Sequence, residues 1–235
     1  MSTALHFPPE PFAPWAEIVP GYGPVAVDIL LTLPDDGYRY EVVEGVLVRM
    51  AGSGFDATTL GLEMGAELRN DVRPRRLGRV TGADGVYKFP GAETGLLPDV
   101  GFIEASKVAL IADLRKPIPF APDLAVEVAS PDQKPDDMAA KARTYLDGGA
   151  CLVWIVWPDR QQIDVWRAGR TVGPAATLHA SGTLDGEDVV PGFVYPVASV
   201  FADPLAVTAK AASSTSPTAP ECNSSRPPTI PPPPR

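Results

Sequence analysis

The 235-residue chain is long enough for one substantial domain and short for two, and its composition, 45% hydrophobic and 21% charged, excludes a fibrous or wholly disordered protein. Its formal net charge of −9 excludes binding to nucleic acid by general electrostatic attraction. Such a role would need metal ions or a local basic patch, and the one basic cluster, "RPRRLGR" at 73–79, is of a kind that is usually a solvated loop.

The scarcity of histidine and cysteine excludes several kinds of catalytic site. The two histidines are His6 and His179, and the two cysteines are Cys151 and Cys222. Histidine zinc sites, Ser-His-Asp triads and Cys-His dyads need more histidine in the folded core, and two cysteines make no disulfide framework. If the chain is an enzyme, we expect carboxylates and lysine to carry its chemistry.

No stretch of the sequence has the features of a membrane span or a secretory signal. The longest apolar run, "CLVWIVW" at 151–157, is far too short to cross a bilayer. The N-terminus has no basic region that leads into an apolar stretch. We therefore expect a cytoplasmic protein without membrane contact.

Composition divides the chain into three segments. Residues 1–24 are rich in proline with scattered aromatics, and we expect them to lie extended over the domain surface. Residues 25–207 have the composition of a folded domain. Residues 208–235 are rich in Pro, Ser and Thr and lack aromatics, which predicts a disordered tail.

Within the domain, strands are expected to outnumber helices. The expected elements, in chain order, are a short helix over 25–34, a hairpin over 38–50 that turns at Glu44-Gly45, a helix over 57–72, strands over 78–89, 96–103 and 123–129, a helix over 134–149, strands over 151–158 and 161–169, and a closing segment over 187–201. This order fits an α/β or α+β fold in which helices flank a single mixed β-sheet.

The strand expected over 123–129, "DLAVEVA", carries a carboxylate where a core strand would not. With a period of two, Ala125, Glu127 and Ala129 share one face, and the two alanines leave room around the carboxylate. A buried carboxylate is costly unless it has a cation, a metal ion or hydrogen-bond donors as partners. Glu127 is therefore a candidate site residue.

A lysine and a second acid are positioned to join Glu127. Lys141 is on the edge of the inward face of the helix over 134–149, at helical spacing from Met138 and Tyr145. Asp99 follows Pro98 and comes directly before another apolar strand. Elements that neighbour each other in the sheet would bring the two acids and the lysine together.

This combination of residues is suited to metal-assisted hydrolysis of phosphodiesters. The carboxylates of Asp99 and Glu127 and a backbone carbonyl, that of Val128, form a hard oxygen site of the kind that Mg²⁺ (or Mn²⁺) prefers. The metal lowers the pKa of a bound water and neutralises phosphate charge, while Lys141 orients the water or stabilises the transition state.

The sequence resembles the PD-(D/E)XK nuclease superfamily, and within it a large bacterial family of restriction-endonuclease-like proteins. The resemblance covers most of the domain: "YRYEVVEGVLVRM", "LLPDVGFI", "APDLAVEVASPDQKPDDMAAKARTYLDGGACLVWIVWPDRQQIDVWR" and "EDVVPGFVYPV". It implies a restriction-endonuclease-like fold, a divalent metal ion and a nucleic-acid substrate, with DNA expected. A homodimer would be compatible with it, since cutting two strands commonly needs two sites.

The resemblance assigns roles to individual residues. Asp99 corresponds to the acid after proline, Glu127 to the second acid, and Lys141 to the lysine. The superfamily usually places its lysine two residues after the second acid, where this chain has Ala129, whereas the family resembled has moved it into the following helix.

Two further acids match the family, and one position departs from it. Glu41 and Glu44 match acids of the opening hairpin and are candidate supporting residues. Family members often carry a histidine near the start of the second helix, where this chain has "GFDATT" at 54–59.

Each candidate also has a structural explanation. Glu127 and Lys141 could form an ion pair that serves stability alone, and Asp99 could be a strand-entry turn residue. Glu41 and Glu44 could be ordinary hairpin acids. Three hypotheses therefore stay open: a metal-dependent nuclease, a non-catalytic module of the same fold that binds nucleic acid or protein, and a phosphohydrolase of small nucleotides.

Overall fold

The computed structural model describes residues 12–170 and 172–202, so the tail expected over 208–235 and the first residues of the N-terminal segment lie outside the described residues. The described strands form three sheets rather than one. The six-stranded sheet has the order β11 (Ala176–Leu178), β10 (Gln162–Arg167), β9 (Leu152–Trp157), β8 (Leu124–Val128), β7 (Val100–Glu104) and β4 (Gly78–Thr81). The five-stranded sheet has the order β1 (Glu17–Ile18), β3 (Val46–Ala51), β2 (Tyr38–Val43), β6 (Gly95–Leu96) and β5 (Tyr87–Lys88), and the third sheet pairs β12 (Thr183–Asp185) with β13 (Val194–Pro196).

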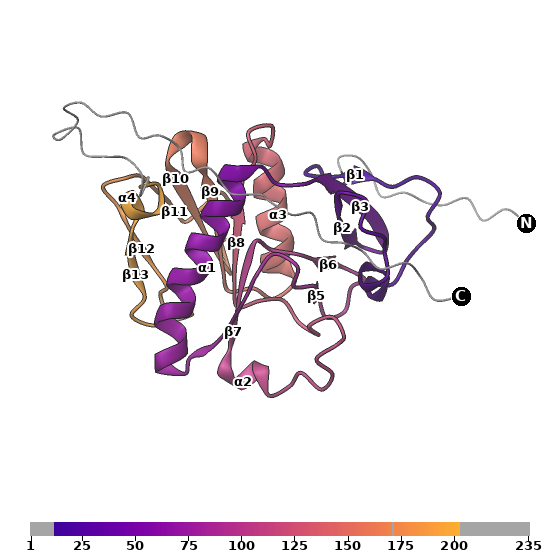
Figure 1. Cartoon of the computed structure of the whole chain (residues 1–235), viewed down its shortest axis with the longest axis horizontal. Coiled ribbons are helices and arrows are strands. Elements are labelled where there is room, and N and C mark those ends of the chain that lie inside the picture. Colours follow the sequence, from indigo (N-terminus) through magenta and orange to yellow (C-terminus); the bar gives the residue numbers. More distant parts are fainter. Residues whose placement is uncertain (1–11, 171, 203–235) are drawn as a thin grey trace, which may run out of the picture. The chain divides into compact units, whose positions relative to one another are not determined.

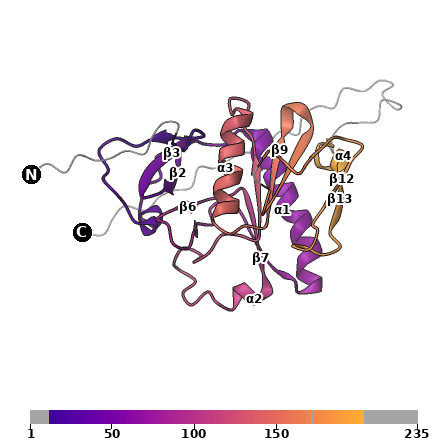
Figure 2. The same cartoon turned by 180° about the vertical axis from the view of Figure 1, so that it is seen from behind.

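Two long helices cover opposite faces of the six-stranded sheet (Figures 1 and 2). They are α1 (Phe55–Arg75) and α3 (Pro135–Asp147); the shorter helices are α2 (Ala105–Val108), α4 (Val197–Val200), and the 3₁₀ helices η1 (Val27–Leu31) and η2 (Pro158–Arg160). The sheet is mixed, because β8 and β9 are parallel and the other neighbours antiparallel. The predicted class, a mixed sheet flanked by helices, is confirmed, whereas the prediction of one sheet is wrong.

Strand β8 divides its side chains between the two helical layers, as the period of two predicts. Leu124, Val126 and Val128 pack in the cluster that contains the apolar residues of α1. Ala125 and Ala129 pack in the cluster that contains those of α3. Glu127 is therefore directed to the side of α3.

The chain passes from one sheet to the other where the sequence analysis expected single strands. The strand expected over 96–103 is interrupted at Pro98 and Asp99, so that β6 belongs to the five-stranded sheet and β7 to the six-stranded sheet. Proline has no N–H to donate to a ladder, which explains the break. Asp99 consequently lies at the junction of the two sheets.

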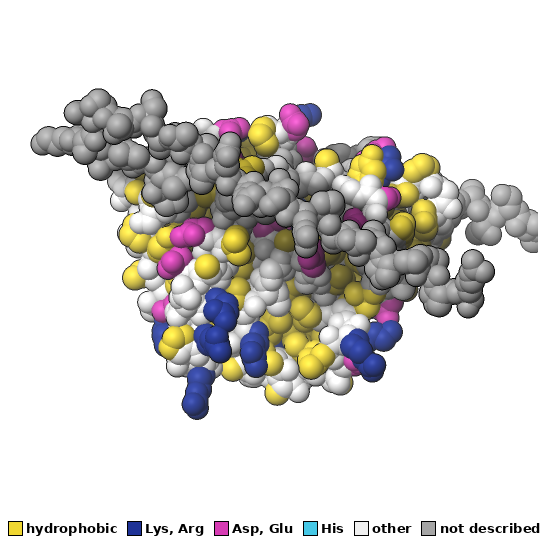
Figure 3. Space-filling model, viewed as in Figure 1, with side chains coloured by type: hydrophobic (Ala, Val, Ile, Leu, Met, Phe, Trp, Pro, Cys, Tyr) yellow, Lys and Arg dark blue, Asp and Glu magenta, His cyan; other side chains and the backbone are white. Residues whose placement is uncertain are grey.

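Glycines allow α1 to lie close to β7. A Cβ atom at Gly61 would lie 3.5 Å from the Cβ of Asp99, and one at Gly65 would lie 3.4 Å from a methyl group of Val100. The glycines that weaken the helix propensity of this segment thus permit its packing. Lys and Arg side chains gather over the C-terminal half of α1 (Figure 3).

The N-terminal segment, where described, does not lie wholly on the surface. Ala13 and Trp15 are buried, and β1 pairs with β3. This corrects the prediction of an extended surface segment: a large indole ring buries much apolar area, which favours its place in the core. Among the described residues, no helix is both long enough and apolar enough to span a membrane.

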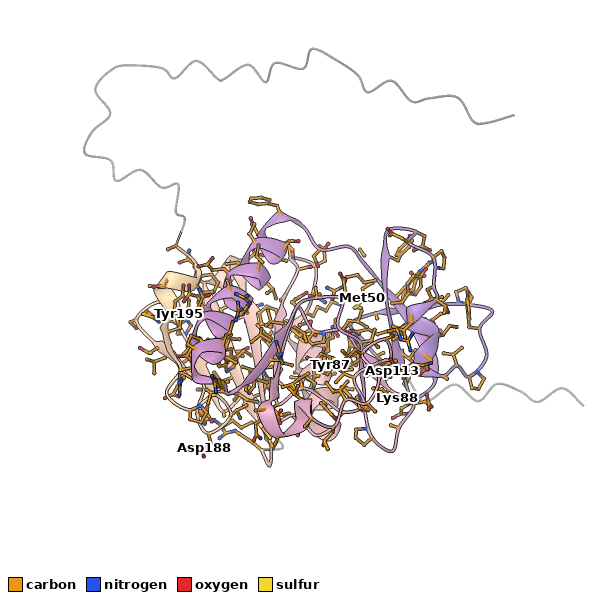
Figure 4. The ribbon with its side chains drawn as sticks, turned by 60° about the horizontal axis from the view of Figure 1, so that its bottom comes forward. Met50, Tyr87, Lys88, Asp113, Asp188 and Tyr195 are labelled. Atoms are coloured by element: carbon orange, nitrogen blue, oxygen red, sulfur yellow. The ribbon has the colours of Figure 1, made fainter. Side chains whose placement is uncertain are left out.

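The packing of the two larger sheets can be tested at Gly101 of β7. Tyr87 of β5 lies in the interior (Figure 4), and a Cβ atom at Gly101 would lie 2.7 Å from its Cζ. Tyr87 is fully buried and hydrogen-bonded to Thr81, so it cannot move aside. We expect Gly101→Ala to lower the free energy of unfolding in urea by about 1–3 kcal/mol.

Gly23→Ala is the matched control, because a Cβ atom at Gly23 meets no atom within 4 Å. Its free energy of unfolding should stay within about 0.5 kcal/mol of wild type. Equal stability of the two variants would contradict the tight packing of Tyr87 on β7.

Candidate active site

Five charged side chains meet where the five-stranded sheet adjoins β8 and α3. Three are acids, Glu41 of β2, Asp99 of the β6–β7 link and Glu127 of β8, and two are cations, Arg39 of β2 and Lys141 of α3. The structure thus connects the three predicted catalytic residues and Glu41 through a chain of contacts, and adds Arg39.

Lys141 lies between two buried carboxylates. Its Nζ is 3.0 Å from Oε1 of Glu127 and 3.1 Å from Oε1 of Glu41. The Tyr145 hydroxyl, one helical turn beyond Lys141, donates a 2.6 Å hydrogen bond to the same Oε1 of Glu127. All four residues are buried, so the positive charge of Lys141 offsets negative charge that would otherwise lie unpaired in the interior.

Both carboxylate oxygens of Glu41 have partners. Besides Lys141, its carboxylate accepts hydrogen bonds from the indole Nε1 of Trp15 at 3.0 Å and from the backbone N–H of Leu97 at 3.2 Å. With both oxygens engaged and the residue fully buried, Glu41 anchors Lys141 and the β6–β7 link. This geometry suits a supporting residue better than a metal ligand.

Both oxygens of Asp99 also have partners. Arg39 donates from Nη1 to Oδ1 at 2.9 Å, and the backbone N–H of Val128 donates to Oδ2 at 2.8 Å. Nη2 of Arg39 donates to the carbonyls of Leu97 and Ala83, so the guanidinium is fixed by three acceptors. Arg39 therefore neutralises Asp99 and holds it against the end of β8.

The buried charges shift one another's proton affinity. Burial raises the pKa of Glu127 from its ordinary 4.5 to about 7; the positive charge of Lys141 opposes this shift, and the negative charges of Asp99 and Glu41 add to it. Burial alone would lower the pKa of Lys141, but Glu127 and Glu41 outweigh it and raise that pKa. Lys141 thus stays protonated at neutral pH, whereas the pKa of Glu127 lies close to neutral pH.

Glu44 is not brought to this cluster. It lies exposed in the turn between β2 and β3, where Glu44 and Gly45 have φ angles of 49° and 79°. Positive φ at both central residues is the geometry of a two-residue hairpin turn, as predicted. The structure thus accounts for Glu44 as a turn residue.

The donor set can be compared with the needs of a divalent metal ion. Among the described residues, no group of three or more acidic, His or Cys side chains is arranged to hold a metal. The carboxylates of Asp99 and Glu127 supply hard oxygen ligands, and the Val128 carbonyl faces the same side of its strand as the N–H that binds Asp99. The residues fit a hard cation, which would compete with Arg39 at Oδ1 of Asp99.

Arg39, Tyr145 and Trp15 also belong to this cluster and were not predicted from the sequence. Arg39 precedes Glu41 by two residues and so shares its face of β2, and Tyr145 follows Lys141 by one helical turn. These two spacings could have predicted from the sequence that Arg39 and Tyr145 join the cluster. No sequence feature places Trp15 beside Glu41.

The pKa of Glu127 predicts how the stability of the protein depends on pH. Because the folded-state pKa is raised from 4.5 to about 7, this carboxyl stabilises the fold fully below pH 4.5, and the contribution is lost as pH rises through 7. From pH 5 to 8, the free energy of urea unfolding of wild type should fall by up to about 3 kcal/mol relative to Glu127→Gln. Parallel pH profiles for the two proteins would contradict the shift.

Comparisons with known proteins identify the family of the chain and a similar fold. Residues 27–198 match the model of the Uma2 family, described as "putative restriction endonuclease". The fold is similar to a crystal structure of a putative nuclease belonging to DUF820 from Anabaena variabilis, with a TM-score of 0.62, 19% identity, and coverage of 76% of this chain and 98% of that chain. No curated protein matches the chain. The family model spans well over half of the sequence, and the chain belongs to the Uma2 family.

Proposed function

We propose that this protein is a Mg²⁺-dependent (or Mn²⁺-dependent) nuclease that hydrolyses phosphodiester bonds in nucleic acid, with DNA as the expected substrate. The observation that carries the proposal is the contact network in which Asp99 binds the end of β8 and Lys141 binds Glu127. These are the three residues that the sequence pattern singled out, and membership of a family described as restriction endonucleases supports the same reaction. A homodimer stays a prediction.

Each residue has a defined part in this proposal. Asp99, Glu127 and the carbonyl of Val128 would hold the metal ion, which when bound supplies an activated water and neutralises phosphate charge. Lys141 and Tyr145 both contact Oε1 of Glu127, so Oε2 is the oxygen that remains for a cation. Lys141 positions its ammonium group to orient the attacking water or to stabilise negative charge in the transition state.

One observation favours the alternative, a non-catalytic module of the same fold. The site compensates its own charges, since Arg39 pairs with Asp99 and Lys141 pairs with Glu127 and Glu41. A metal ion would gain affinity only in so far as it outcompetes these internal cations. A measurement of metal binding therefore distinguishes a metal-dependent nuclease from a non-catalytic module.

Cleavage assays test the catalytic role of the acids. Glu127→Gln and Asp99→Asn should each reduce metal-dependent cleavage of single- and double-stranded DNA and RNA by about 100-fold or more, because each removes a charged oxygen ligand. Glu44→Gln is the matched control, as it makes the same change on an exposed acid outside the cluster. Unchanged activity in Glu127→Gln would refute the proposed site.

Calorimetry with Mn²⁺ tests whether the cluster binds metal at all. We expect wild type and Glu44→Gln to bind one ion, since the latter leaves every acid and cation of the cluster in place. Glu127→Gln should lose the binding. A wild-type protein that releases no heat of binding at millimolar Mn²⁺ would favour the non-catalytic module.

A further inference from the structure

A cavity of about 600 Å³ opens beside Asp99, between α1 and the turn that follows β4. This volume lies within the usual range of small-molecule sites, roughly 300–1,000 Å³. Asp99 and Arg39 line it, whereas Glu127 and Lys141 do not. Of the charged cluster, it is therefore the Arg39–Asp99 pair that faces this space.

Small residues on one face of α1 create the space. Ala57, Gly61, Gly65 and Ala66 line the cavity, and Leu62 adds an exposed apolar side chain at its wall. Val80 and Val100 contribute from the six-stranded sheet. The walls are thus mostly apolar and suited to the face of a planar ring.

Polar groups stand at the edge of this apolar space. Arg39 and Arg69 supply positive charge, and Asn70 supplies an amide that can both donate and accept hydrogen bonds. Arg39 is held by its contacts with Asp99, Leu97 and Ala83, and Asp99 offsets its charge, whereas Arg69 forms no ion pair among the described residues. The carboxylates of Asp84 and Asp99 also line the cavity, and Arg39 is paired with Asp99.

The positive charge continues beyond the cavity along α1. Arg69 and Arg73 are four residues apart and share one side of the helix, and Arg76, also exposed, is the C-cap residue just past the helix end. Figure 3 shows Lys and Arg side chains gathered there. Among the described residues, none of the three takes part in an ion pair, in contrast to Arg75, which pairs with Asp71. In a chain of net charge −9, this row is a local basic patch.

We infer that the cavity binds one nucleotide of the substrate strand, with its base against the apolar wall of α1 and its phosphate at Arg69, and that Arg73 and Arg76 contact the neighbouring phosphates. This inference rests on the proposed nuclease function and names its substrate as a strand with an unstacked base. The arginine row favours a polymer over a free nucleotide, since a mononucleotide has no phosphate to place there.

The test measures binding without hydrolysis, by fluorescence anisotropy of a labelled 20-nucleotide DNA strand with the full-length protein in EDTA. Ala66→Trp fills the cavity and Arg69→Gln removes a charge at its edge. Each should raise Kd for the strand by tenfold or more. Arg69→Gln should also reduce the slope of log K against log salt by about 0.7.

Two matched variants control for these changes. Thr59→Trp places the same side chain at an exposed position of α1 outside the cavity, and Arg170→Gln removes an exposed arginine elsewhere. Both should leave Kd within twofold. If Ala66→Trp lowers the midpoint of unfolding, the Kd of Arg69→Gln alone tests the inference. Arg69 is exposed, so its replacement should leave the fold intact.

The outcomes separate the cavity from the catalytic proposal. Strand binding unaffected by both Ala66→Trp and Arg69→Gln would overturn the inference, and so would binding of deoxyadenosine monophosphate without binding of the strand. Hydrolysis of bis(p-nitrophenyl) phosphate by the Mn²⁺-loaded protein should depend on Glu127, and it tests the catalytic proposal without a polymer strand. Its absence in wild type would count against the nuclease function and leave the binding result intact.

Discussion

The buried contact of Lys141 with Glu127 and Glu41 is the interaction on which the rest of the site depends. It joins α3, β8 and β2, and therefore adds a charged contact to the apolar packing that the two larger sheets share. A lysine in this position must be paired, because an isolated buried ammonium is costly. The same pairing keeps two acids ionisable within an otherwise apolar interior, which is the condition for any metal chemistry there.

A second pair, Arg39 and Asp99, sets the state of the site without metal. The guanidinium of Arg39 contacts Oδ1 of Asp99, an oxygen that a divalent ion would also bind. Three acceptors fix this guanidinium in place. Arg39 thus stabilises Asp99 at the end of β8 and at the same time competes with a cation.

The sequence predicted that Glu127 and Lys141 meet, and it predicted the fold class but not the division of the strands between sheets. The alternation in β8 and the helical spacing of α3 placed Glu127 and Lys141 on facing surfaces, because both rules are local. The division of the strands between sheets was missed, although Pro98, which cannot join a ladder, marks the break. Trp15 reaches Glu41 through tertiary packing across 26 residues of sequence, and no local pattern contains that contact.

The most direct test of this account is a crystal structure of the protein soaked in Mn²⁺, with anomalous diffraction used to locate the ion. The account predicts one anomalous peak between the carboxylates of Asp99 and Glu127, within about 2.2 Å of an oxygen of each. Arg39 Nη1 would then have left its 2.9 Å contact with Asp99. A structure at saturating Mn²⁺ without a peak there, and with the Arg39–Asp99 pair intact, would contradict it.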